Sequence, residues 1–267
     1  MSPLFSIITV TYNAEKVLER TLRSVAEQSY ARIEYIVIDG ASTDGTMEIV
    51  TSYKSQSPGL VRFEVISEPD KGLYDAMNKG LRVATGDYVW FLNAGDTLQS
   101  PETVARLAEV AERNGMPDIL YGETDVVDEQ GKFLAARRLK APEHLTWKSF
   151  RMGMLVCHQA FVMKREAAPE YDLQYRFSAD FDWCIRCMKQ STAIVNSHLR
   201  LIHYLAEGMT TRNRKASLKE RYRIMCNYYG TFPTRIRHLW FALRFYWAKL
   251  FGNNADQIGR ASCRERV

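Results

Sequence analysis

Residues 4–14 read LFSIITVTYNA and contain the first strand-to-helix pattern of the chain. Residues 4–11 form a continuous apolar run rich in β-formers, which predicts a short strand buried on both faces. Asn13 is suited to cap a helix, and the residues that follow it recur at helical spacing. These are Val17, Leu18, Thr21, Leu22 and Val25. The stretch therefore predicts a strand that leads directly into a helix.

The alternation of strand and helix continues along the chain. Further strands are predicted at 33–39, 61–67 and 88–93, and further helices at 44–53 and 74–84. Short strands that are apolar on both faces and alternate with helices are typical of a mostly parallel sheet covered on both sides. We therefore expect a Rossmann-like α/β fold whose ligand site lies at the carboxyl ends of the strands.

The pattern beyond Pro101 is less regular, and we expect an elaboration on the same sheet. It predicts helices at 102–113 and near 182–189, with β-like segments at 119–124 and 156–164.

Composition and charge fit an ordinary globular protein. The chain has 267 residues, of which 46% are hydrophobic and 25% are charged, so it can bury a sizeable core. Neither a secretory signal nor an apolar run of about 18 residues is recognised, and we expect a cytoplasmic protein. Cys184 and Cys187 form a C-x-x-C within a helical run, where packing is favoured over a zinc site.

Polar residues gather where the first four predicted strands end, in the segments 11–13, 39–40, 68–70 and 93–96. The common glycine-rich phosphate loops are absent, so the charge of a phosphate ligand needs another partner. Asp96 is suited to hold a hard cation such as Mg²⁺ or Mn²⁺, although it could instead cap the next helix. Asp39 taken alone is also explained as a turn residue.

Three ordered motifs resemble the inverting family 2 glycosyltransferases, which have the GT-A fold. They are SIITVTYN at 6–13, IDGASTDGT at 38–46 and FLNAGD at 91–96. The segment EPDKGLYDAMNKG at 68–80 also resembles the branch that builds bacterial exopolysaccharides, including colanic-acid-type transferases. The likeness covers about residues 4–215. It implies transfer of a sugar from a nucleotide-diphosphate sugar, preferably a UDP-sugar, to an acceptor hydroxyl with inversion, in bacterial surface polysaccharide synthesis.

The resemblance assigns the nucleotide to the strand ends. The residues expected around it are Thr9, Thr11, Tyr12, Asn13, Asp39, Asp70, Lys71, Asn93, Ala94 and Gly95. Among them, Asp39 is expected to accept a hydrogen bond from the base, for which uracil is suited. Asp70 and Lys71 are expected near the ribose or the diphosphate.

The resemblance also implies that Asp96 is the ligand of a Mn²⁺ or Mg²⁺ cofactor. Asn93 stands where many relatives carry a second carboxylate, so the metal affinity without nucleotide is expected to be weak.

The general base is expected in the second half of the chain. Residues 178–183, SADFDW, resemble the acidic run at the start of a helix in this family, and Asp180 matches its catalytic carboxylate. Asp180 and Asp182 could instead stabilise the helix N-terminus. We favour catalysis for Asp180 and the helix for Asp182, which is kept as a secondary acceptor-site candidate.

Further candidates come from weaker matches. His158 and Gln159 resemble a segment of the branch that faces the acceptor, and a buried core histidine is the alternative. Thr210 and Arg212 are expected near the diphosphate, in a loop that departs from the family pattern at Met209. His203 is a distant candidate for a further metal ligand.

The predicted organisation divides the chain near residue 230. Residues 1–230 are expected to form the GT-A domain, with a nucleotide-binding half at 1–97 and an acceptor half at 98–230. Residues 231–257 are expected to form a basic, aromatic-rich amphipathic helix, which either lies on an anionic membrane or packs on protein. Residues 258–267, IGRASCRERV, are expected to be non-native read-through.

The expected partners are a nucleotide-sugar donor, a saccharide acceptor that is free or lipid-linked, and the inner face of the plasma membrane. A nucleic-acid partner is not expected, because the basic residues after position 230 are interleaved with aromatic ones. Two alternatives remain. A sugar nucleotidyltransferase would open with a glycine-rich, arginine-bearing loop, which residues 9–14 lack. A non-catalytic nucleotide-sugar-binding protein would lack a base such as Asp180.

Overall fold

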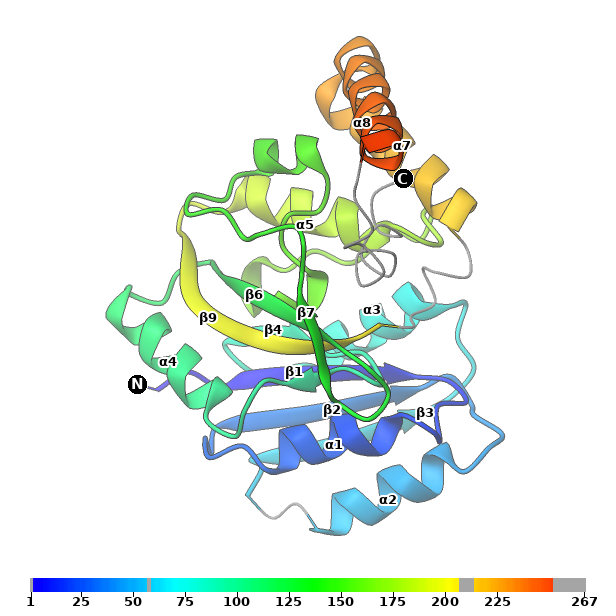
Figure 1. Cartoon of the computed structure of the whole chain (residues 1–267). Coiled ribbons are helices and arrows are strands. Elements are labelled where there is room, and N and C mark those ends of the chain that lie inside the picture. Colours follow the sequence, from blue (N-terminus) through cyan, green and yellow to red (C-terminus); the bar gives the residue numbers. More distant parts are fainter. Residues whose placement is uncertain (1, 57–58, 207–213, 252–267) are drawn as a thin grey trace.

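The predicted strands and helices form one layered α/β arrangement in the computed structural model, which describes residues 2–56, 59–206 and 214–251 (Figure 1). Within these residues the strands form a single sheet in the order β3-β2-β1-β4-β8-β6-β9-β5, with β7 paired to β6. The expected α/β fold, with helices against the sheet and a helical extension at the C-terminal end, is confirmed.

Four parallel strands make one side of the sheet: β1 (Phe5–Thr11), β2 (Ile33–Asp39), β3 (Arg62–Ser67) and β4 (Tyr88–Phe91). Every residue of β1, β2 and β4 is buried, as their continuous apolar runs predict. Side chains within these strands therefore belong to the core, and only groups at the strand ends are in a position to meet a ligand.

Three helices cover these strands: α1 (Leu18–Ala26), α2 (Thr46–Gln56) and α3 (Leu73–Val83). The buried residues of α1 are Leu18, Thr21, Leu22 and Val25, all of them among the residues at the predicted helical spacing. α3 packs closely on β1 and β2 at Gly80, where an added Cβ would lie 2.5 Å from Cγ2 of Ile8.

The second half of the chain completes the sheet and adds helices. Its elements are β5 (Thr97–Leu98), α4 (Thr103–Arg113), β6 (Ile119–Val127), β7 (Phe133–Ala136), β8 (Phe161–Lys164), α5 (Ala179–Gln190) and β9 (Ile194–Leu205), with 3-10 turns at Trp147–Met152, His158–Ala160 and Arg165–Ala167. The strand predicted at 156–164 begins only at Phe161, because His158–Ala160 forms a 3-10 turn. The helix predicted near 182–189 begins earlier, at Ala179.

β9 is a long strand that the sequence pattern did not predict. It pairs in parallel with β6, and the register shifts between Tyr121 and Glu123. At Gly122 the two strands approach so closely that an added Cβ would lie 2.5 Å from the carbonyl oxygen of Leu199. β9 ends at Leu205, which brings the distant end of this strand beside the loop after β4.

The described chain ends in α7 (Arg214–Tyr229) and α8 (Thr231–Phe251). The two helices contact each other through the rings of Tyr222 and His238, 5.0 Å apart, and through a hydrogen bond from Thr234 Oγ1 to the Met225 carbonyl at 3.2 Å. They lie together at the end of the molecule away from α1 and α2 (Figure 1). A search of the described residues finds no helix with the length and apolar character needed to cross a membrane.

Candidate active site

The ends of β1, β2 and β3 bring Thr11, Asp39 and Ser67 into one row, because the three residues are paired in register. Asp39 is fully buried, and its carboxylate accepts hydrogen bonds from the Ser42 amide at 2.9 Å and from the Ser67 hydroxyl at 2.7 Å. The Ser42 hydroxyl also donates to it. Thr11 Oγ1 is buried and has no hydrogen-bond partner within the described residues. Asp39 is thus held in a defined orientation beside a buried hydroxyl whose hydrogen-bonding capacity is not used by the described residues.

The next residues along the chain surround Gly40. A Cβ at Gly40 would lie 2.5 Å from Oδ2 of Asp70 and 3.3 Å from Cδ2 of Tyr12, so these two side chains converge on the glycine. Tyr12 leaves 64% of its surface exposed. Oδ1 of Asp70 accepts a hydrogen bond from the Gly72 amide at 2.7 Å, which fixes the carboxylate over the strand ends. An exposed aromatic ring and a fixed carboxylate therefore border one small space.

Three other residues that were predicted to contact the nucleotide lie in different surroundings from one another. The hydroxyl of Thr9 lies in the core, 3.0 Å from the hydroxyl of Tyr35. Thr9 precedes Thr11 by two positions in β1, on the same face of the sheet. Asn13 adopts a left-handed backbone conformation, and its side-chain oxygen accepts a hydrogen bond from the Thr43 amide at 2.9 Å. Lys71 is exposed. Of the three, Asn13 shapes the loop between β1 and α1, and Lys71 is the one that solvent and ligands can reach.

Asp96 lies in the turn after β4 and is 4% exposed. Its Oδ1 accepts a hydrogen bond from the Leu205 amide at 2.9 Å, and its Oδ2 accepts one from Nε2 of Gln159 at 2.8 Å. Its carbonyl accepts a third bond from the Thr21 hydroxyl at 2.8 Å. Burial raises the pKa of Asp96 to about 7, against the lowering effect of the two hydrogen bonds to its carboxylate and of Arg20. A cation beside this carboxylate would stabilise the charged form that burial disfavours.

The turn Asn93-Ala94-Gly95-Asp96 also presents an unpaired oxygen. Oδ1 of Asn93 is buried and has no hydrogen-bond partner within the described part of the chain. Each carboxylate oxygen of Asp96 accepts one hydrogen bond and so has capacity for another ligand. Gly95 has φ of +97°, and a Cβ there would lie 2.9 Å from Leu205, so the turn depends on glycine. These oxygen donors fit a hard divalent cation.

A complete cation cage is not formed by protein groups alone. Among the described residues, no three His, Cys, Asp or Glu side chains gather in a metal-binding arrangement. Hard cations such as Mg²⁺ are often held by one or two carboxylates and completed by phosphate oxygens and water.

Asp180 lies in the first turn of α5 and is half-buried. Its Oδ1 accepts a hydrogen bond from the hydroxyl of Tyr74 at 3.0 Å and another from the Phe181 amide at 2.9 Å. Within the described residues its Oδ2 has no hydrogen-bond partner. Tyr74 belongs to α3, directly after the loop that carries Asp70. A carboxylate from the second half of the chain is therefore attached to the same edge of the sheet as Asp39 and Asp70.

A buried aromatic cluster connects Asp180 with the Asp96 turn. Nε2 of His158 lies 2.6 Å from the hydroxyl of Tyr171, and the Tyr171 ring stacks on Tyr74 at 5.5 Å. Gln159, the neighbour of His158, contacts Asp96 as described above. Burial lowers the pKa of His158 to about 4, although nearby Asp180 acts in the opposite direction. His158 is thus a neutral core residue near pH 7, and Gln159 orients Asp96.

Asp182 has the contacts of a structural residue. It is 4% exposed, and its two oxygens are engaged by Arg186 at 2.7 Å and by the hydroxyl of Tyr228 at 2.8 Å. These contacts fit the helix-stabilising interpretation. Cys184 and Cys187 are free and buried in α5, and burial raises the pKa of both thiols.

The start of α5 is held by α7 through Glu220. One carboxylate oxygen of Glu220 accepts a hydrogen bond from the Arg176 amide at 2.9 Å, and the other accepts bonds from Phe177 at 2.7 Å and Ser178 at 3.0 Å. Because these three amides directly precede the helix that bears Asp180, Glu220 sets the direction from which that helix starts.

Tyr74 and Glu220 position the site but were not among the predicted residues, and Gln159, predicted near the acceptor, is instead the hydrogen-bond partner of Asp96. Tyr74 lies inside the quoted EPDKGLYDAMNKG segment, so the motif was a signal, but its partner is 106 positions away along the chain. For Glu220 the sequence offers no comparable signal.

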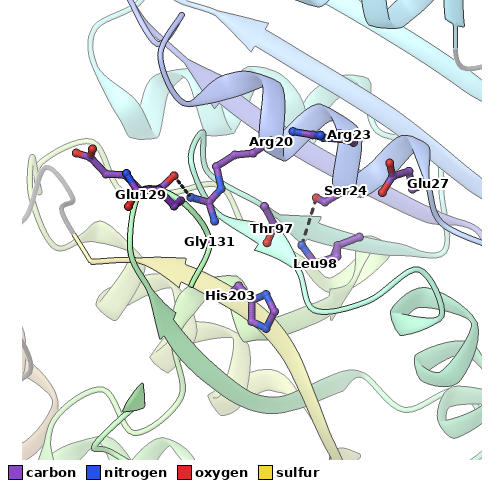
Figure 2. Close-up of a pocket in the computed structure, with 10 residues that line it drawn as sticks. Arg20, Arg23, Ser24, Glu27, Thr97, Leu98, Glu129, Gly131 and His203 are labelled. Carbon is purple, nitrogen blue, oxygen red and sulfur yellow. Dashed lines mark hydrogen bonds between the residues drawn. The ribbon is translucent and has the colours of Figure 1, made fainter. Parts of the chain in front are cut away.

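The cavity of about 320 Å³ shown in Figure 2 lies elsewhere. Its lining comes from α1, β5, the β6–β7 turn and β9, and comprises Arg20, Arg23, Ser24, Glu27, Thr97, Leu98, Glu129, Gln130, Gly131 and His203. Of the sequence-predicted candidates it contains only His203, whose pKa is lowered chiefly by burial. Thr210 and Arg212, the predicted diphosphate residues, lie outside the described residues.

A mostly parallel sheet with Asp39, Asp70 and Asp96 in or after the ends of its strands is the arrangement expected of a GT-A-type glycosyltransferase. Residues 6–171 match the family model described as glycosyl transferase family 2. A PGL/p-HBAD biosynthesis glycosyltransferase of Mycobacterium bovis is 34% identical over 205 residues, which is 75% of each chain. The chain therefore belongs to glycosyltransferase family 2, as the motifs indicated, and is a hexosyltransferase-type enzyme.

Other comparisons agree on family and fold. The amylovoran biosynthesis glycosyltransferase AmsB of Erwinia amylovora is 32% identical over 195 residues, 69% of this chain and 64% of that one. S. aureus TarS 1-349 in complex with UDP-GlcNAc superposes with a TM-score of 0.65 at 19% identity, covering 95% of this chain and 77% of that one. The mannosyltransferase PcManGT of Pyrobaculum calidifontis, in complex with GDP-Man and Mn²⁺, gives 0.60 at 17% identity and the same coverage.

Replacing Glu220 by Gln should lower the free energy of unfolding by about 1–3 kcal/mol, because an amide NH₂ group would face backbone amides that need an acceptor. Urea denaturation of the two proteins measures the difference. The matched control is Glu109→Gln, which removes an exposed ion pair with Arg113 on α4 and should change the stability by about 0.5 kcal/mol or less. Equal effects of the two substitutions would contradict the role assigned to Glu220.

Proposed function

We propose that this enzyme transfers a sugar from a UDP-sugar to the hydroxyl of a saccharide acceptor, with inversion, in the synthesis of a bacterial surface polysaccharide. The observation that carries the proposal is the Tyr74–Asp180 hydrogen bond of 3.0 Å. It ties a carboxylate with one uncommitted oxygen to the start of α3, directly after the loop that carries Asp70, at the edge of the sheet where Asp39 ends its strand.

The nucleotide would bind over the ends of β1, β2 and β3. The buried Asp39 carboxylate would accept the N3–H of uracil by exchanging one of its serine partners, and the unpaired Thr11 hydroxyl lies in the same row. Tyr12 offers an exposed ring for the base, and Asp70 a fixed carboxylate for the ribose hydroxyls. The UDP-GlcNAc complex of TarS, which shares the fold, supports a UDP-sugar as donor.

The cofactor would be Mn²⁺ or Mg²⁺, held by Asp96 with the side-chain oxygen of Asn93 and completed by oxygens of the donor diphosphate. The cation would neutralise charge on the departing diphosphate, and such preorganised charge is usually the largest catalytic contribution. Mn²⁺ in the PcManGT complex supports this assignment. Thr210 and Arg212 are proposed to contact the same diphosphate.

Asp180 is proposed as the general base. Tyr74 and the Phe181 amide engage its Oδ1, which leaves Oδ2 to accept the proton of the acceptor hydroxyl. The acceptor oxygen bonds to the anomeric carbon from the face opposite the diphosphate. As that bond forms, the carbon–oxygen bond to the diphosphate breaks, and its electron pair leaves with the nucleotide.

The acceptor would lie beside Asp180, above the cluster of His158 and Tyr171. The relative named for amylovoran biosynthesis supports a saccharide acceptor. We propose that the acceptor is lipid-linked and that the reaction takes place in the cytoplasm at the inner face of the plasma membrane. Gln159 orients the metal ligand in this proposal, and Asp182 orients α5.

A donor screen tests the function directly. The protein is incubated with Mn²⁺, with UDP- or GDP-sugars, and with or without lipid-linked saccharide acceptors, and nucleotide diphosphate release is measured. We expect acceptor-dependent release from a UDP-sugar and a product of inverted anomeric configuration by NMR. Release from GDP-sugars alone would refute the uracil assignment. Nucleotide binding without transfer to any acceptor would favour a binding protein.

Replacing Asp180 by Asn should lower kcat by at least about 100-fold, because the amide cannot take the proton of the acceptor hydroxyl. The affinity for UDP, measured by calorimetry, should change little. Asp128→Asn is the matched control: Asp128 accepts the amides of Gln130 and Lys132 in the β6–β7 turn, and an Asn oxygen can do the same. Transfer at the normal rate by Asp180→Asn would exclude Asp180 as the base.

Replacing Asp96 by Ala should abolish the dependence of UDP binding on Mn²⁺, because the proposed anionic metal ligand is lost. Titration of UDP with Mn²⁺ and with EDTA measures the effect. Asn93→Ala should weaken the Mn²⁺ effect without removing it, since only a neutral ligand disappears. An undiminished Mn²⁺ effect in Asp96→Ala would show that the cation binds elsewhere.

A further inference from the structure

α8 presents a row of large apolar side chains that are largely exposed. Its members are Phe232, Ile236, Leu239, Trp240 and Leu243, with 74%, 53%, 63%, 46% and 59% of their surfaces exposed. Single exposed apolar residues are common on proteins, but a group of large ones on one element marks an interaction site.

The helical positions show that this face is a true stripe. At 3.6 residues per turn, the five apolar residues fall within an arc of about 100°. Thr234 and His238 fall on the opposite side, where Thr234 is fully buried and both contact α7. α8 therefore rests on the protein with one side and turns its apolar side outward.

Basic residues border this apolar stripe. Arg235 and Arg237 fall on its two flanks, and α8 contains no Asp or Glu anywhere between Thr231 and Phe251. An apolar face with arginines at its margins is the arrangement of helices that lie in the plane of a membrane interface, where the long side chains reach the headgroups.

We propose that the α8 stripe docks into the headgroup layer of an anionic lipid bilayer. Charge complementarity favours this occupant over a second copy of the chain. A two-fold contact between two α8 stripes would bring the flanking arginines of both copies together, and α8 offers no carboxylate to pair with them. Anionic headgroups supply the missing negative charge.

The docked helix lies next to the proposed acceptor side of the enzyme. α8 packs on α7, and α7 holds the start of the Asp180 helix through Glu220. A bilayer at α8 therefore supplies a surface from which a lipid-linked saccharide reaches Asp180. The docking itself does not rest on the proposed transfer chemistry, because it is measured without donor or acceptor.

Flotation with vesicles tests the proposal. The full chain is mixed with vesicles of phosphatidylcholine, alone or with anionic phosphatidylglycerol, and the floating fraction is measured. We expect flotation with the anionic vesicles and its loss in Phe232→Glu. The matched control is Phe133→Glu, the same change at a 55% exposed position on β7, which should float as the unchanged protein does. Equal flotation of the three proteins would overturn the proposal.

A second pair of variants tests the charge. Replacing Arg235 and Arg237 together by Gln should lower the vesicle partition coefficient by about tenfold or more. Replacing Arg106 and Arg113 on the exposed side of α4 by Gln should leave it unchanged. Light scattering without vesicles tests whether a second copy of the chain binds the stripe instead. A dimer that Phe232→Glu converts to a monomer would assign the stripe to a second copy and refute the membrane assignment. Circular dichroism confirms that each variant is folded.

Discussion

The site depends on one buried carboxylate. Asp96 is removed from water at the point where the β4 turn, the 3-10 turn of Gln159 and the end of β9 meet, and a buried charge is costly unless it is hydrogen-bonded or paired. Two hydrogen bonds do not compensate burial fully, because the pKa of Asp96 is still raised to about 7. The fold thus holds a carboxylate whose charged form a neighbouring cation would favour.

Polar groups at the strand ends also connect the two halves of the chain. The parallel strands are buried on both faces, so their polar groups are confined to the strand ends. The second half then approaches those ends through single hydrogen bonds: Gln159 and Leu205 to Asp96, and Asp180 to Tyr74. Each bond joins groups separated by many positions in sequence, and together they place the proposed metal ligand and base around one edge of the sheet.

The difference between local patterns and contacts across the chain explains which features the sequence could predict. The strands β1 and β2 and the residues that α1 buries follow from local apolar patterns, whereas the roles expected for Asp39 and Asp96 came from the resemblance to the family and not from their positions at strand ends alone. β9 was not predicted because polar residues interrupt its apolar ones at Asn196, Ser197, His198 and Arg200. The strand is also irregular there, since His198 has a positive φ and the register with β6 shifts. The roles of Tyr74 and Glu220 were not predicted for a different reason, since they consist of contacts with partners far away in the chain.

The match to the family model ends at residue 171, before the carboxylate that we propose as the base. The case for Asp180 therefore depends on what anchors it. Tyr74 lies within the matched region and donates to Asp180 from a buried ring, while Glu220 on α7 fixes the three amides that precede the helix. One contact comes from the nucleotide side of the site and the other from the helix pair that bears the α8 stripe. In our proposal, the carboxylate held between these two supports is the base that meets a nucleotide-bound sugar and an acceptor arriving from the α8 side.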